Sequence, residues 1–301
     1  MPAKTKEARV FEGSVVPLVT PFRNGAVDEQ AFARLVERQL RAGSHGLSVG
    51  GTTGEPAGLS LEERKRLIRL TVELAGGRRP VLAGTGSANL EATLELTRYA
   101  REAGADGALV ITPYYTKPSQ EGLFAYFARV AEAVPEFPLV IYNIPGRACV
   151  PVAVETLARL RERYPWVVGV KHSLKDLDVV SRTIRTLGEE FAVFCGLESL
   201  TYPMLALGAR GMIAATANLL PSEVARLYEA VKAGRHDEAR ELHYRLYEVN
   251  EAIFWETNPV PLKYLMARAG LIEAEWRPPL GPPSPEVAAR LDRLAAAWGW
   301  V

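Results

Sequence analysis

Short apolar runs alternate with longer amphipathic segments along the first two thirds of this chain, and this alternation constrains the fold more than any other feature. The runs are too short for globular helices, whereas the segments between them repeat apolar residues every three to four positions, as helices do. The runs are rich in Val, Ile and Leu without polar alternation, which is typical of parallel strands buried on both faces and joined by helices. We expect eight strands, at residues 15–20, 46–49, 81–83, 108–112, 139–143, 167–171, 192–195 and 212–214.

Eight strand and helix units that close on themselves form an α/β fold, the (β/α)8 or TIM barrel. An open, doubly wound sheet is the alternative, and the count of eight favours closure. The one glycine-rich turn after a predicted strand, at residues 84–89, lacks the third glycine of a dinucleotide-binding fingerprint. We therefore expect no dinucleotide cofactor.

Helix signals in the intervening segments support this reading. Asp28 can cap a helix that carries Phe32, Leu35 and Leu40 on one face. Ser60 and Glu63 have the spacing of a capping box. We expect both helices to cover the sheet.

The alternation stops after the eighth predicted strand, and the remaining sequence is helical. Helical patterns occupy residues 222–247, 261–269 and 285–298, and several prolines crowd the connection before the last of them. We predict a barrel over residues 1–220 and a C-terminal helical subdomain over residues 221–301.

Charge and cysteine usage limit the function classes. Lys and Arg total 36 against 35 Asp and Glu, so no net field attracts nucleic acid or an anionic membrane. The first 13 residues carry charges where a secretory signal is apolar, and no run could span a bilayer, so we expect a cytoplasmic protein.

Cys149 and Cys195 stand beside apolar stretches, so we expect both side chains to pack in the core. The four histidines show no metal-binding spacing. We expect no metal site and no cofactor.

Lys171 ends the predicted strand at residues 167–171, although lysine is rarely buried unless it pairs with an acidic group or has a functional role. The active site of such a barrel lies at the carboxyl ends of its strands. An apolar barrel mouth disfavours the charged ammonium, and only the neutral amine can attack a ketone. A lysine that simply emerges into solvent is the alternative.

Polar residues follow three other strands. Tyr142 could move protons, or its hydroxyl could merely bond a loop carbonyl. Arg147 could hold a carboxylate with two hydrogen bonds, or it could form a surface salt bridge. Residues 50–55 carry three glycines around Thr52 and Thr53, so their backbone N–H groups could bind a small carboxylate. A purely structural turn would have the same sequence pattern. Residues 112–115 add two tyrosines, which could be packing or interface residues.

Four of these motifs together resemble the dihydrodipicolinate synthase and N-acetylneuraminate lyase family. They are GTTGE at residues 51–55, TPYY at 112–115, YNIPGR at 142–147 and GVK at 169–171, and the similarity continues through residues 211–218 and 256–263. This order and placement cover nearly the whole chain. The resemblance implies a pyruvate-dependent lyase of the class I aldolase type, active as a homotetramer built from two dimers.

The resemblance also implies the residue roles. Lys171 would form an imine with pyruvate, and Tyr142, Thr52 and Tyr115 would relay protons, with Tyr115 reaching a neighbouring subunit's site. Gly51, Thr53 and nearby backbone amides would bind the pyruvate carboxylate, and Ile213 would pack beside it.

Arg147 implies an acidic aldehyde as second substrate, because synthases of this family carry that arginine and sialic acid lyases usually lack it. The default is aspartate semialdehyde, which gives 4-hydroxy-tetrahydrodipicolinate. Three departures from the usual pattern, at residues 148–149, 172 and 197–198, leave open an aldolase that cleaves 4-hydroxy-2-oxoheptanedioate to pyruvate and succinate semialdehyde. A non-catalytic protein that binds a keto acid and a phosphate-binding barrel enzyme are alternatives from other classes.

Overall fold

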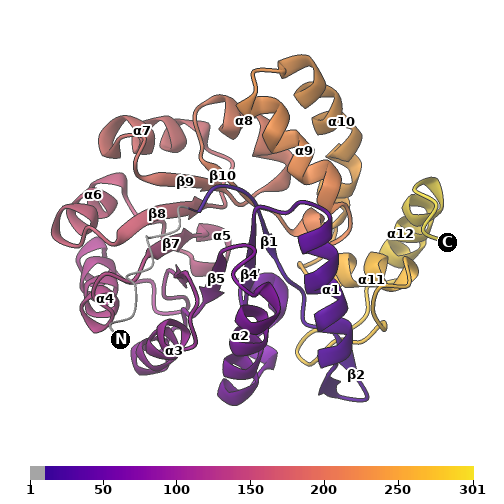
Figure 1. Cartoon of the computed structure of the whole chain (residues 1–301), viewed down its shortest axis with the longest axis horizontal. Helices are drawn as coiled ribbons and strands as arrows, with labels where there is room; N and C mark the ends of the chain where they lie inside the picture. Colours follow the sequence, from indigo (N-terminus) through magenta and orange to yellow (C-terminus); the bar gives the residue numbers. More distant parts are fainter. Residues whose placement is uncertain (1–10) are drawn as a thin grey trace.

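The computed structural model describes residues 11–301, so the predictions made for the first ten residues lie outside it. Eight parallel strands form a closed barrel in the order β1-β10-β9-β8-β7-β6-β5-β4. Figure 1 shows them at the centre of a ring of helices. The strands are β1 (Gly13–Pro17), β4 (Gly46–Val49), β5 (Val81–Gly84), β6 (Gly107–Ile111), β7 (Leu139–Asn143), β8 (Val167–His172), β9 (Ala192–Cys195) and β10 (Gly211–Ile213). The predicted (β/α)8 barrel is confirmed.

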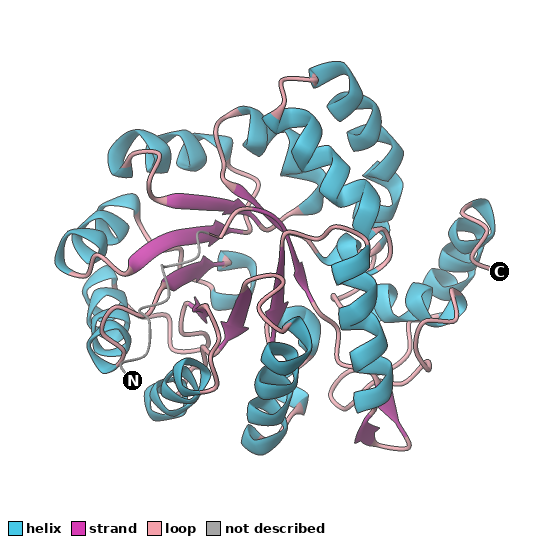
Figure 2. Cartoon of the chain, in the orientation of Figure 1, coloured by secondary structure: helices cyan, strands magenta, loops and turns pink. Residues whose placement is uncertain are grey.

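Most of the helices cover the outside of the barrel (Figure 2). Helices follow the strands along the chain. They are α1 (Glu29–Arg41), α2 (Leu61–Ala75), α3 (Leu90–Glu102), α4 (Gln120–Ala133), α5 (Pro145–Ala148), α6 (Val154–Arg163), α7 (Leu177–Leu187), α8 (Thr201–Ala206), α9 (Pro221–Lys232), α10 (His236–Ala252), α11 (Val260–Arg268) and α12 (Pro285–Ala297). Both predicted N-caps are present: Asp28 accepts from the Ala31 N–H, and Ser60 and Glu63 bond reciprocally. None of the helices in residues 11–301 combines the length and apolarity needed to cross a membrane.

All eight predicted strands occur, with small shifts at their ends. The largest shift is at β1, which was expected to run to residue 20 and ends at Pro17. Beyond it the Val19 N–H bonds the side-chain oxygen of Asn218, where a strand would bond a neighbouring carbonyl. The chain therefore leaves the barrel earlier than its apolar sequence suggests.

Two apolar clusters hold the barrel. The larger lies between strands and helices. The smaller joins alternate residues of the strands inside the barrel, including Val15, Leu82, Leu109, Val140 and Phe194. Layers of such side chains make a barrel interior a packed core, so only its mouth is left for a ligand.

A short hairpin, β2 (Phe22–Arg23) with β3 (Ala26–Val27), was not predicted. Its turn is Asn24-Gly25, with φ of +54° and +77° at the two residues. Asn-Gly is the preferred pair for a two-residue hairpin turn that needs positive φ at both positions. The signal was therefore present in the sequence.

The C-terminal region differs from the predicted pattern in one place. The helical stretch expected at residues 222–247 is two helices, α9 and α10, separated by a turn in which Gly234 has a φ of +71°. Helix α9 packs against β1, whereas α12 lies past α11 at the outer edge of the molecule (Figure 1). The division of the chain at residue 220 stays a prediction.

The two cysteines behave differently. Cys195 is buried, as expected, but Cys149 is exposed. Cys149 ends helix α5 with a φ of +65°, and this left-handed turn carries its side chain away from the core. The predicted core packing was wrong for Cys149.

Candidate active site

Lys171 lies inside the barrel near the end of β8. Its side chain is 6% exposed, and its Nζ lies 4.2 Å from the centre of the Tyr142 ring on the neighbouring strand β7. The next residue, His172, points the other way, because its ring nitrogens lie 3.1 Å from Asn143 Nδ2 and 3.2 Å from Thr183 Oγ1. Strand alternation thus places the amine at the interior and the imidazole in the barrel wall.

Gly196 makes room for this lysine. A Cβ built on Gly196 would lie 2.6 Å from Lys171 Cε and 2.1 Å from Ser173 Oγ. Both separations are far shorter than van der Waals contact, so any side chain here would displace the lysine.

If Lys171 reacts with a keto acid, as the sequence resemblance implies, substitution Gly196→Ala should lower kcat/KM for that keto acid about 10- to 100-fold, because a misplaced amine loses its alignment. The measurement is steady-state turnover with the thermal midpoint recorded alongside. Gly146→Ala is the control, because a Cβ there meets nothing within 4 Å. Unchanged kinetics of Gly196→Ala would contradict this placement.

A small cavity of about 40 Å³ surrounds the lysine. Its lining joins residues from the ends of several strands and from two later loops: Pro17, Thr52, Thr53, Tyr142, Ile144, Arg147, Lys171, Gly196, Leu197, Glu198, Ile213, Ala215, Phe254 and Asn258. A larger cavity of about 520 Å³ adjoins it and shares Thr52, Tyr142, Arg147 and Asn258. A small keto acid at the lysine would thus have space for a second reactant beside it.

The loop after β4 brings Thr52 and Thr53 to these cavities. Gly50 turns the chain with a φ of +74°. A Cβ on Gly84 of β5 would lie 2.6 Å from the Gly50 and Gly51 backbone, so only glycine allows this approach. Gly51 and Thr52 line the larger cavity, and Thr52 and Thr53 line the smaller one.

Asn258 connects this loop to Arg147, although the two are far apart in sequence. Its Nδ2 donates to Thr53 Oγ1 at 3.1 Å, and its backbone oxygen accepts from Arg147 Nη2 at 3.0 Å. Arg147 also donates to Thr257 Oγ1 at 3.2 Å. A guanidinium has five N–H donors, so these bonds hold Arg147 in place and leave donors for an anionic ligand.

A buried ion pair holds the end of the loop that follows β4. Glu55, at the end of the GTTGE motif, receives a hydrogen bond of 2.5 Å from Lys263 Nζ of α11. Both side chains are almost fully buried, and the Lys263 amine lies 4.3 Å from the centre of the Phe22 ring. Burial raises the pKa of Glu55 and lowers that of Lys263, and their mutual attraction opposes both shifts.

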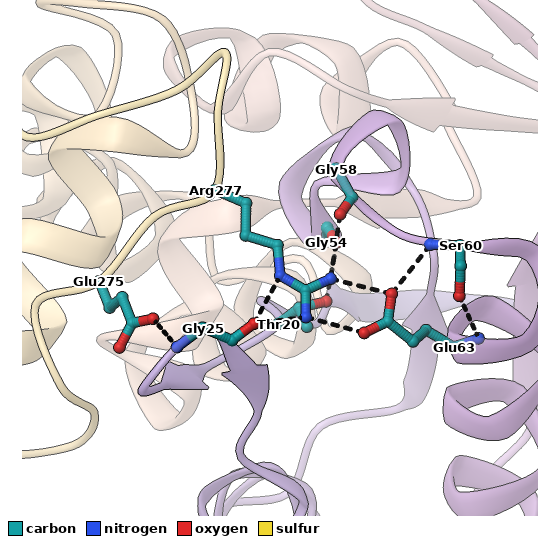
Figure 3. A network of polar contacts seen from close by, with 8 residues as sticks. All are labelled: Thr20, Gly25, Gly54, Gly58, Ser60, Glu63, Glu275 and Arg277. Carbon is teal, nitrogen blue, oxygen red and sulfur yellow. Dashed lines mark hydrogen bonds and ion pairs between the residues drawn. The ribbon is translucent and has the colours of Figure 1, made fainter.

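Arg277 supports the outer wall of the larger cavity. Figure 3 shows its guanidinium between the hairpin at Gly25 and the first turn of α2. It bonds the Gly25 oxygen at 2.8 Å, the Gly58 oxygen at 3.1 Å and both carboxylate oxygens of Glu63 at 2.8 Å. The hydrogen bonds from Arg277, together with those from Ser60, lower the pKa of Glu63 to about 2. The C-terminal segment therefore closes one side of the cavity.

The structure brings most of the predicted site residues together. Lys171, Tyr142, Thr52, Thr53, Arg147 and Ile213 all line the smaller cavity, and Gly51 lines the larger one. Tyr115 is 90% exposed and lines neither cavity of its own chain, whereas its neighbour Tyr114 lines the larger one. The proposed role of Tyr115 in another subunit stays a prediction.

Sequence reasoning missed Gly196 and Asn258 as site residues, and it noted Glu198 only as a departure from the family pattern. Asn258 lies in a motif that resembles the family, so its sequence neighbourhood was a signal. Within residues 11–301, no group of three or more His, Cys, Asp or Glu side chains is arranged to hold a metal ion.

Comparison with known proteins agrees with this geometry. The model of the dihydrodipicolinate synthetase family matches residues 10–297. A 4-hydroxy-tetrahydrodipicolinate synthase of Thermus thermophilus is 61% identical over 290 residues, which are 96% of this chain and 97% of that protein. The chain therefore belongs to the dihydrodipicolinate synthetase family.

Solved structures give the same result. The dihydrodipicolinate synthase of Aquifex aeolicus superimposes with a TM-score of 0.94 at 42% identity, over 96% of this chain and 99% of that one. The chloride-inhibited dihydrodipicolinate synthase of Acinetobacter baumannii, solved in complex with pyruvate, gives a TM-score of 0.93 at 35% identity, over 97% of this chain and all of that one.

Proposed function

We propose that this protein is a class I, Schiff-base lyase that condenses pyruvate with aspartate semialdehyde to 4-hydroxy-tetrahydrodipicolinate. The observation that carries the proposal is the buried Lys171 amine, 4.2 Å from the Tyr142 ring, in a cavity that Thr52, Thr53 and Arg147 also line. Relatives and structural neighbours named for this reaction support it.

The chemistry follows from the nucleophile. The neutral Lys171 amine attacks the keto carbon of pyruvate, and loss of water gives a protonated imine. This cation makes the pyruvate methyl group acidic, so a proton leaves and an enamine carbon forms. The enamine then attacks the aldehyde carbon of the second substrate. The amino group of the semialdehyde next attacks the imine carbon and displaces the Lys171 amine, which closes the six-membered ring and frees the enzyme. Tyr142 and Thr52 line both cavities, so their hydroxyls are suited to move these protons.

The second substrate would occupy the larger cavity, with its carboxylate on Arg147. Arg147 lines both cavities and Lys171 lines the smaller one, so the guanidinium stands where the two cavities meet. Charge-assisted bonds from a planar guanidinium favour a carboxylate.

Substitution Arg147→Ala should lower kcat/KM for the semialdehyde about 10- to 100-fold, because hydrogen bonds to charged groups are worth about 1.5–3 kcal/mol. The rate at which pyruvate alone modifies Lys171 should stay close to wild type. The control is Arg185→Ala, at an exposed site on α7. Equal loss in both assays would mean that Arg147 shapes the whole site and does not select the aldehyde.

The departures from the family pattern affect the pocket unequally. His172 stands in the barrel wall, bonded to Asn143 and Thr183, so its exchange for the usual acidic residue leaves the cavities unaltered. Leu197 and Glu198 do line the small cavity. This observation keeps the cleavage of 4-hydroxy-2-oxoheptanedioate as a second candidate function.

A direct comparison separates the candidates. One assay follows condensation of pyruvate with aspartate semialdehyde, and the other follows pyruvate release from 4-hydroxy-2-oxoheptanedioate. We expect kcat/KM for condensation to be at least about 100-fold higher. The reverse ratio would favour the aldolase, and imine formation with pyruvate but no turnover of either substrate would favour a non-catalytic keto-acid-binding protein.

We further propose that the enzyme works in the cytoplasm as a homotetramer. The cytoplasm is where such small metabolite substrates are found. In the tetramer, the exposed Tyr115 side chain would complete the active site of a neighbouring subunit. Sedimentation of the native chain tests the assembly.

A further inference from the structure

The buried carboxyl group of Glu198 lies in the lysine cavity and has no role in the chemistry described so far. Glu198 begins the short 3-10 turn that follows β9, and its side chain is 4% exposed. One carboxyl oxygen accepts the Ala215 N–H at 2.5 Å. The other, Oε2, is buried without a hydrogen-bond partner in the part of the chain that the structure describes. Because a buried polar atom without a partner is costly, such an atom calls for an explanation.

Lys171 is a cation that shares a cavity with this carboxyl. The amine stands on β8, and both residues line the same cavity, where their charges attract. The neighbouring strand β9 presents Cys195, whose thiol stays neutral because burial raises its pKa to about 12. Helix α10 presents the uncharged Asn250, which donates to the Glu198 backbone oxygen, and the chain after β10 presents the backbone N–H of Ala215.

The other ionisable groups of the cavity are Tyr142 from β7 and Arg147 from α5. Tyr142 places its ring against the lysine, and Arg147 is held by Thr257 and Asn258. Burial raises the pKa of Glu198 to about 6, and the attraction of Lys171 opposes this rise. A carboxyl with such a pKa can take up and release a proton near neutral pH.

We propose that Glu198 accepts a proton from the Lys171 ammonium, through water in their shared cavity, and so supplies the neutral amine that attacks pyruvate. The inference rests on the proposed function. A cavity of about 40 Å³ has room for a water molecule, which needs roughly 10–15 Å³ of such space. The partnerless Oε2 atom is the acceptor that this transfer requires.

The proton balance closes over one imine formation. The ammonium gives one proton to the carboxylate, leaving a neutral amine and a neutral carboxyl group. The amine adds to the keto carbon, and proton transfer within the adduct gives a carbinolamine. Glu198 then returns its proton to the departing hydroxyl, which leaves as water while the nitrogen lone pair forms the protonated imine. Glu198 ends as the carboxylate from which it began.

A purely structural role is the alternative, since Glu198 could serve only to bond the Ala215 N–H. Glutamine can accept the same bond with its side-chain oxygen but cannot take up a proton. Glu198→Gln therefore separates the two roles, and the exposed Glu190→Gln is its matched control.

The experiment measures the initial rate of imine formation from pyruvate between pH 5 and 9, by timed borohydride quench and mass spectrometry of the intact chain. In the wild type we expect a level rate above about pH 6 and a fall below it, because protonated Glu198 cannot accept a second proton. In Glu198→Gln we expect a rate about 10- to 100-fold lower at pH 7 that rises steadily with pH, as hydroxide takes over the deprotonation.

Two results would overturn the inference: a Glu198→Gln profile that matches the wild type, or a wild-type rate that shows no level region above pH 6. The second result needs only the wild-type protein, so the test holds even where the variant fails to fold. Complete absence of an adduct in the wild type would instead reject the proposed function, so the two failures are distinguishable.

Discussion

Replacing Lys171 with alanine should lower kcat for condensation at least about 10³-fold while the barrel stays folded. Among residues 11–301, Lys171 is the only lysine that lines the small cavity, and loss of a covalent nucleophile removes the whole proposed route. Lys171 lies in a cavity, so a shorter side chain leaves more room there and forces no neighbour to move. The measurement is turnover at saturating pyruvate, together with the thermal midpoint.

Lys175→Ala is the matched control, because this lysine follows the same strand and is exposed. Its turnover should equal that of the wild type. Near-normal turnover by a folded Lys171→Ala variant would show that another group carries the chemistry.

Replacing Lys263 with methionine should lower the free energy of unfolding by about 3–5 kcal/mol, because removing one member of a buried pair leaves the other charge uncompensated. Lys263 is fully buried and pairs with Glu55 at 2.5 Å. Because Glu55 ends the loop that presents Thr52 and Thr53, the surviving folded protein should also bind pyruvate more weakly. Urea unfolding and pyruvate titration measure the two effects.

The double variant Lys263→Met with Glu55→Gln should recover part of the lost stability, because it removes the uncompensated carboxylate. Lys232→Met is the surface control, since Lys232 pairs with Glu12 in an exposed position. Exposed pairs contribute about 0–1 kcal/mol. Equal effects of Lys263→Met and Lys232→Met would contradict the importance of burial for this pair.

The barrel and the buried lysine at its mouth could be predicted because both depend on local patterns. Strands buried on both faces show as unbroken apolar runs, so the lysine at the end of one such run stood out. The Tyr142 and Lys171 side chains come together through the register of β7 with β8, which neighbouring parallel strands make predictable.

The rest of the site depends on contacts between distant segments. Asn258 reaches Thr53 across 205 positions, and Lys263 reaches Glu55 across 208. No local period marks such partners. In the sequence Glu198 is marked only by its departure from the family pattern, and only the folded chain shows its side chain buried in the lining of the lysine cavity. Gly196 likewise needs the position of Lys171 to explain it.

The central claim is that the Lys171 amine forms an imine with pyruvate. Borohydride reduction in the presence of pyruvate, followed by peptide mass mapping, tests it most directly. We predict one reduced adduct per chain, located on the peptide that contains Lys171 and absent when pyruvate is omitted. An unmodified Lys171, or an adduct on a different lysine, would contradict the account.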